Sequence, residues 1–120
     1  MTTYPSLNKI SGIDFPFPSL NAATGTGAGD IKQFPMPVNV ISCQVSYDGG
    51  PSAVKVTLEG SIDATNWFVL STFDTGASGA SGNIITSSTV VINAARANLQ
   101  TLTGGTNPTV SAFILANRGG

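Results

Sequence analysis

The sequence predicts an all-β protein made of a single antiparallel β-sandwich, jelly-roll topologies included, that follows an extended N-terminal arm. Three observations predict it. Apolar and polar residues alternate with a period of two from residue 38 onward; turn residues separate the alternating runs; and no window of ten or more residues has the spacing of an amphipathic helix. Short strands with regular turns are typical of antiparallel sandwiches and barrels. The length, 120 residues, suits one domain with one core.

Residues 1–37 are expected to form the arm, and residues 38–120 the sandwich domain. Five of the seven prolines lie in the arm, and "DFPFPSL" and "QFPMPV" each place two prolines one residue apart, which fixes φ and disfavours helix. Between them, "NAATGTGAGD" is typical of a flexible link. Apolar side chains of the arm need a surface to pack on, either their own domain or a neighbouring subunit. These candidate contact residues are Phe15, Phe17, Leu20, Phe34 and Met36.

The clearest alternation of apolar and polar residues in the domain lies in "AVKVTLEGSI", residues 53–62. Val54, Val56 and Leu58 share one face there and are predicted to be core residues, whereas the polar residues between them face the other way. Further strands are expected at about 38–47, 67–73, 84–92, 95–102 and 109–116.

The turn "DATN" should close a hairpin after this strand. Asp63 is suited to accept hydrogen bonds from the backbone two residues on, and Asn66 to adopt a left-handed conformation. Trp67 then begins the returning strand, with Val69 on its side, and both are predicted to be core or structural residues. The alternative for Trp67 is a carbohydrate-binding role, because aromatic rings stack on sugars.

The chain lacks most of the residues that enzymes and metal sites use. It has no His and a single Cys, Cys43, whose phase within a strand predicts burial as a small apolar side chain. The six carboxylates are scattered, which disfavours a glycosidase pair, and those in turns are better explained as solvated groups than as calcium ligands. The glycines of "TGTGAGD" lack the spacing of a nucleotide fingerprint. We therefore expect a non-enzymatic protein without metal or cofactor.

Charge and hydropathy narrow the set of partners. Charged residues make up 9% of the chain, against about 25% in a typical soluble domain, and the net charge is −1. Five dispersed Lys and Arg residues are too few for a nucleic-acid surface, and no apolar run is long enough to cross a bilayer. Arg96 is expected to face outward and either to pair with a carboxylate or to contact a partner. Such a surface favours association with other proteins.

Two stretches carry a resemblance to a known group of proteins. "VKVTLEGSIDATNWFVLST" and, after a Gly/Ser loop, "ARANLQTLTGGTNPTVSAFI" resemble the strand-turn-Trp and Arg-strand pattern of small β-sandwich virion proteins of tailed bacteriophages, including capsid decoration, or cement, proteins. The resemblance covers about residues 53–116. It implies a protein that is made in the host cytoplasm, sits on the outer capsid surface as a homo-oligomer, often a trimer, and binds the major capsid protein to fasten adjacent capsomers.

Two alternatives remain open from the sequence. A tail, baseplate or fibre component would have the same strand pattern, and a carbohydrate-binding module would use Trp67 and Tyr47 as ring surfaces.

Overall fold

The computed structural model describes residues 16–75 and 91–117, and within these ranges every regular element is a β-strand. The strands are β1 (Phe17–Ala23), β2 (Gly27–Ala28), β3 (Lys32–Val38), β4 (Val40–Asp48), β5 (Ala53–Ser61), β6 (Phe68–Asp74), β7 (Ile92–Thr103) and β8 (Thr109–Asn117). Most of the expected strand 84–92 lies outside the described residues, and only its last residue, Ile92, appears as the start of β7.

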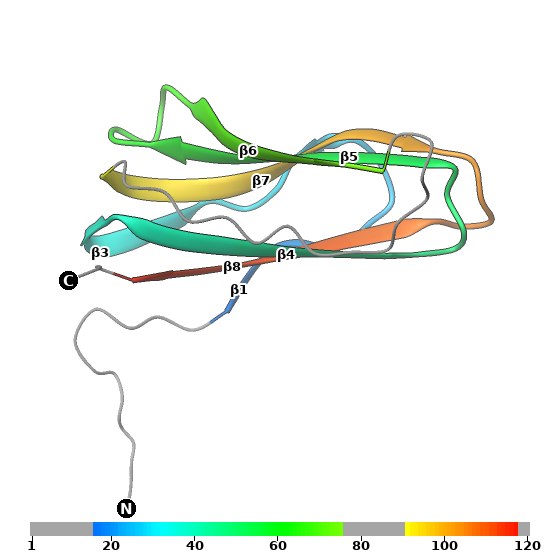
Figure 1. Cartoon of the computed structure of the whole chain (residues 1–120), viewed down its shortest axis with the longest axis horizontal. Helices are drawn as coiled ribbons and strands as arrows, with labels where there is room; N and C mark the ends of the chain where they lie inside the picture. Colours follow the sequence, from blue (N-terminus) through cyan, green and yellow to red (C-terminus); the bar gives the residue numbers. More distant parts are fainter. Residues whose placement is uncertain (1–15, 76–90, 118–120) are drawn as a thin grey trace, which may run out of the picture.

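The strands form two sheets that pack face to face (Figure 1). The small sheet has three strands in the order β1-β8-β4. The large sheet has five, in the order β2-β7-β5-β6, with β3 also paired to β7. All of these pairs are antiparallel. The prediction of an antiparallel β-sandwich is confirmed.

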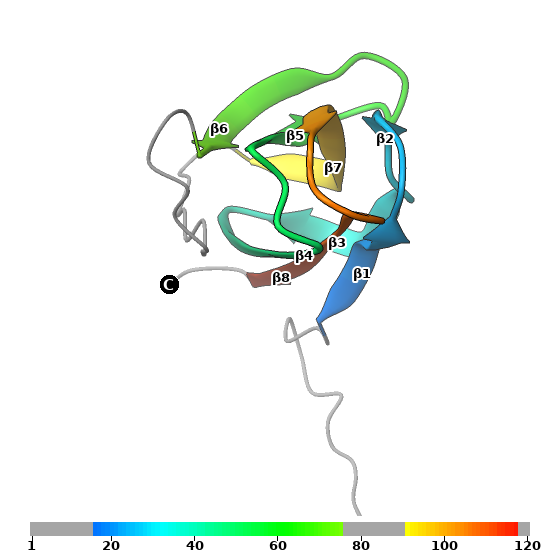
Figure 2. The ribbon, with the colours of Figure 1, turned by 90° about the vertical axis from the view of Figure 1, so that its right-hand side faces the viewer.

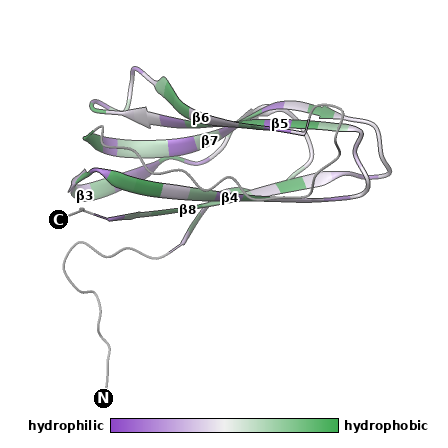
Figure 3. Ribbon diagram, in the orientation of Figure 1, coloured by the Kyte–Doolittle hydropathy of each residue, from purple (hydrophilic) through white to green (hydrophobic). Residues whose placement is uncertain are grey.

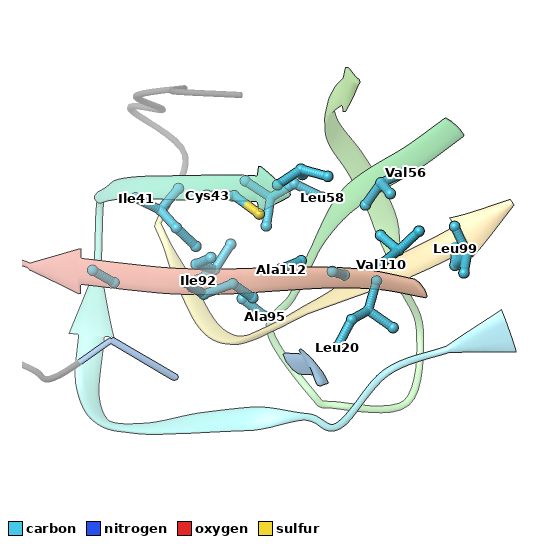
Figure 4. Packing of buried hydrophobic residues seen from close by; sticks show 14 of the residues in the cluster. Leu20, Ile41, Cys43, Val56, Leu58, Ile92, Ala95, Leu99, Val110 and Ala112 are labelled. Carbon is cyan, nitrogen blue, oxygen red and sulfur yellow. The ribbon is translucent and has the colours of Figure 1, made fainter. Parts of the chain in front are cut away.

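The core lies between the sheets and is built from alternate residues of each strand. Bands of hydrophobic and hydrophilic residues follow one another along the ribbons (Figure 3). Val54, Val56 and Leu58 on β5 are fully buried and meet β4 and β8 residues such as Ile41 and Val110 across the interior (Figure 4). Because the strand period is exactly two, this burial fixes which residues reach the two outer faces.

The structure corrects the expected boundary at residue 37. β1 pairs with β8 and β3 pairs with β7, so residues 17–37 belong to the sandwich of their own chain. The prolines do not prevent this, because both pairings contain register irregularities and proline is tolerated at edges and bulges. Leu20 and Phe34 are consequently buried in the core. Residues 1–15 lie outside the described residues.

The supposed link between the two proline-containing segments is tied to both sheets by three residues that we name the Ser19 clasp: Ser19, Asp30 and Ala97. The backbone N–H of Ala97 on β7 donates to Ser19 Oγ at 2.8 Å, and Ser19 Oγ donates to the carbonyl of Asp30 at 2.7 Å. The N–H of Asp30 in turn donates to the carbonyl of Ser19 at 2.7 Å. Figure 2 shows the turn from β1 to β2 closing this side of the sandwich.

A bulge changes the phase of β6. Leu58 lies opposite Ser71 but Glu59 lies opposite Val69, so one additional residue is accommodated on β6. Val69 therefore faces outward beside Glu59 and is 56% exposed, which corrects its prediction as a core residue. Phe73, which pairs with Val56, packs against the core instead.

Candidate functional site

The outer face of the small sheet carries apolar side chains. The cross-strand pairs Ser42–Leu115 and Gln44–Phe113 lie on it, because the residues between them on β4 and β8 point into the core. Phe113 is 39% exposed and Leu115 is 43% exposed. We call the surface formed by Pro16, Val40, Ser42, Gln44, Phe113 and Leu115 the apolar face. None of these residues carries a charge.

The apolar face is hollowed. A shallow groove of about 320 Å³ is lined by Pro16, residues 42–44 and residues 113–115. A second hollow of about 140 Å³ lies along the same two strands and shares Ser42 and Leu115 with the first. An uncharged groove that exposes Phe and Leu side chains has the composition of a protein-contact surface.

Cys43 borders the groove, but its side chain points into the core. It is buried, and desolvation raises the pKa of its thiol to about 12. The thiol is therefore neutral at physiological pH, and a neutral thiol is a poor nucleophile and metal ligand.

The outer face of the large sheet is built around a buried carboxylate. Glu59 on β5 is 7% exposed, and its Oε1 accepts a hydrogen bond from Arg96 Nε at 2.8 Å in a salt bridge. Glu59 Oε2 accepts from Asn98 Nδ2 at 3.1 Å and from Thr57 Oγ1 at 3.2 Å. Register explains the gathering, since Glu59 lies directly opposite Arg96, and Thr57 opposite Asn98.

An aromatic ring completes this surface. The guanidinium carbon of Arg96 lies 4.3 Å from the centroid of the Trp67 ring, a cation–π contact, and the indole is half-buried. We call the set Thr57, Glu59, Trp67, Arg96 and Asn98 the Glu59 cluster.

The turn before Trp67 is closed by hydrogen bonds to Asp63. Asp63 Oδ1 accepts hydrogen bonds from the backbone N–H groups of Thr65 at 2.9 Å and Asn66 at 2.8 Å, the local pattern expected for this turn. These bonds, with one from Asn66 Nδ2, hold the pKa of the Asp63 carboxyl well below its usual range. The left-handed residue is Ala64, at φ 59°, and not Asn66 as expected.

The predicted contact residues of the arm lie in different environments. Leu20 and Phe34 are core residues of their own chain, so they are not available to a partner. Phe17 is half-buried with the Lys32 Nζ 5.8 Å from its ring centroid, and Met36 is exposed. Phe15 lies outside the described residues. Arg96 faces outward and pairs with a carboxylate, one of the two arrangements expected for it.

Sequence reasoning missed Phe113, Leu115 and Glu59. A signal existed for the first two, because "AFILA" is apolar on both faces of its strand, which indicates a strand covered on both sides. No sufficient local signal existed for Glu59. Only Thr57 among its three partners lies on the same strand, whereas Arg96 and Asn98 come from β7.

Residues 16–75 and 91–117 contain no group of three or more His, Cys, Asp or Glu side chains arranged to hold a metal ion. In the same ranges there is no helix long and apolar enough to span a membrane.

Comparison with known proteins identifies the fold. No protein-family model matches the chain, and no curated protein matches its sequence. Among solved structures, it is similar to the SPBc2 prophage-derived protein YomS, with a TM-score of 0.59 and 11% identity over 90% of this chain and 97% of YomS. It is also similar to PirA, with a TM-score of 0.52 and 13% identity over 92% of this chain and 100% of PirA. The chain therefore has a small β-sandwich fold that a prophage-derived protein shares.

Proposed function

We propose that the protein is a non-enzymatic structural protein of a bacteriophage virion, and specifically a capsid decoration protein. In this proposal it binds the major capsid protein on the outer capsid surface and stabilises the contacts between adjacent capsomers. The observation that carries the proposal is the uncharged, grooved apolar face of the small sheet. The fold that the chain shares with a prophage-derived protein supports the phage origin.

The apolar face suits a contact made in many copies. Docking a surface that displays Phe113 and Leu115 without charges carries a small desolvation cost, whereas burying charged groups would carry a large one. Even a modest contact becomes strong when many subunits bind one lattice. A homotrimer at local threefold positions of the capsid would use such a surface either between its subunits or against the shell.

The test is binding to undecorated, expanded capsids of the source phage. Purified protein is mixed with capsids, and bound protein is counted from the mass of the particles by light scattering. We expect saturation at a fixed copy number that relates to the capsid symmetry. A defined oligomer that ignores capsids and instead co-purifies with tails would overturn decoration and identify a tail, baseplate or fibre component.

A matched pair of variants tests the role of the apolar face. The double variant Phe113→Ser/Leu115→Ser should lose capsid binding or the oligomeric state, while Val69→Ser should retain both. Val69 is the suitable control, because it is an exposed apolar residue on the opposite sheet. Equal capsid binding and an unchanged mass for both variants would show that another surface makes the contact.

A further inference from the structure

The Glu59 cluster has features that the proposed capsid contact does not use. A buried ion pair is a weak source of stability, because desolvation offsets most of its attraction and apolar replacements are often neutral. Here the ion pair lies on the outer face of a sheet, where apolar or solvated residues would serve equally well. Its clearest structural effect is to hold the planar groups of Arg96 and Asn98 in fixed orientations.

These fixed groups keep polar atoms available. Arg96 uses Nε to bind Glu59, and within residues 16–75 and 91–117 its two terminal nitrogens have no hydrogen-bond partner. Asn98 donates through Nδ2, which leaves its Oδ1 as a side-chain acceptor. Gln100 lies beside them, with Nε2 3.5 Å from Thr57 Oγ1. Donors and an acceptor are thus presented together next to the half-buried indole of Trp67.

We propose that the Glu59 cluster is a carbohydrate-binding site on the outer face of the large sheet. A sugar hydroxyl both donates and accepts hydrogen bonds, so it matches the mixture of Arg96 nitrogens and Asn98 oxygen. The C–H face of a pyranose stacks on an indole, and the Trp67 side chain is only half-buried. The site is built before the ligand arrives, and this reduces the entropy lost on binding.

Charge decides between a neutral sugar and an anion. Glu59 neutralises Arg96 at 2.8 Å, and among the described residues no other Lys or Arg side chain is hydrogen-bonded to the cluster. A phosphate or carboxylate would therefore meet a site without net positive charge. A neutral glycan is the ligand class that fits.

The chain supplies its own reporter for the experiment, because Trp67 is its single tryptophan. Fluorescently labelled protein is first applied to an array of bacterial polysaccharides and defined oligosaccharides. Soluble forms of the sugars that bind are then titrated against the unlabelled protein, and Trp67 emission is recorded. We expect saturable binding to at least one neutral glycan, with a matching saturable change in emission.

Substitutions connect the signal to the cluster. Arg96→Lys keeps the charge but removes the forked donors and the planar stacking, and should weaken affinity at least about tenfold. Asn98→Ala should weaken it similarly, and because it is a milder change it serves if Arg96→Lys reduces folding. Ser46→Ala is the control, because Ser46 is an exposed residue of the small sheet that belongs neither to the apolar face nor to the Glu59 cluster. This variant should bind as the parent chain does, and thermal melting confirms that each variant is folded.

Three results would overturn the proposal. The first is an array and titrations without any saturable response. The second is binding that Arg96→Lys and Asn98→Ala both retain at full strength. The third is binding restricted to anionic glycans and abolished by added salt, which would indicate charge attraction to a different surface. The capsid experiment is independent of all three, so the two proposals succeed or fail separately.

Discussion

The two outer faces of this sandwich share one core but differ in chemistry. The small sheet presents uncharged residues around Phe113 and Leu115, whereas the large sheet presents Glu59 and Arg96 joined in a hydrogen-bonded network. The first face has exposed apolar area without specific polar geometry, and the second has fixed polar geometry with one aromatic ring. The comparison teaches that strand alternation, which fixes the inner faces, leaves each outer face free to acquire its own partner.

The largest difference in stability is expected between substitutions at an inward-facing and an outward-facing residue of the same strand. Ile114 is buried and Phe113 is its exposed neighbour on β8. Ile114→Ala should lower the free energy of unfolding by about 2–5 kcal/mol, because it leaves a cavity in the core. Phe113→Ala should change it by no more than about 0.5 kcal/mol, as surface substitutions usually do. Urea unfolding measures both, and a similar loss for the two variants would mean that the small sheet is covered on both sides in the isolated protein.

The next effect distinguishes the two outer faces. Glu59→Ala removes the carboxylate partner of the mostly buried Arg96 side chain. It should lower the free energy of unfolding by about 3 kcal/mol, at the lower end for breaking a buried pair. Leu115→Ala on the apolar face should cost far less, since that side chain is exposed. Thermal melting of both variants gives the comparison. If Glu59→Ala melts at the same temperature as the parent chain, the cluster is solvated and Glu59 does not hold Arg96 and Asn98 in fixed orientations.

A smaller loss is expected at the side where the two sheets are tied together. Ser19→Ala removes the acceptor of the Ala97 N–H and the donor to the Asp30 carbonyl. Leaving a buried N–H unsatisfied costs about 1–3 kcal/mol. Ser111→Ala is the matched control, because Ser111 Oγ accepts a hydrogen bond from the Ala22 N–H at an exposed position. Equal effects in urea unfolding would show that the clasp adds nothing beyond an ordinary surface bond.

The effect that is smallest at neutral pH is a pH dependence that originates at Cys43, beneath the apolar face. Burial raises the pKa of Cys43 from 9.0 to about 12, so folding favours the neutral thiol. The associated stability is fully present below pH 9.0 and is lost as the pH rises toward about 12, with a slope of at most about 1.4 kcal/mol per pH unit. Cys43→Ala should lack this component of the alkaline slope. Rapid reaction of the native protein with a thiol reagent at pH 8 would contradict the burial.

Much of the fold could be predicted from the sequence, because strand period and turn residues act locally. The inward phase of Val54, Val56 and Leu58 and the antiparallel architecture follow from them. The pairing of β1 with β8 and of β3 with β7 could not be predicted. Their sequences, "FPSLNAA" and "KQFPMPV", lack a clean alternation and owe their extended form to these long-range partners. Val69 was misplaced because a bulge shifts the phase of β6 by one residue.

The candidate sites were harder to predict for the same physical reason. The outward position of Arg96 follows from alternation, but its pairing with Glu59 depends on the register of β5 against β7, which is fixed across 37 residues of sequence. The hollow of the apolar face also needs Pro16 and the strands β4 and β8, which come from distant parts of the chain. Local pattern predicts which way a residue faces, whereas only the assembled sheet determines what it meets.

The small sheet has a consequence for how the chain is made. Its central strand, β8, follows the other described strands along the chain, and β1 reaches it across 89 residues, as the Ala22–Ser111 hydrogen bond illustrates. A growing chain on the ribosome can pair β5 with β6 as soon as both emerge, but β1 and β4 have no partner in the small sheet until β8 has emerged. Until then the inner face of the large sheet stays uncovered. The strand β8 therefore both completes the small sheet and creates the apolar face.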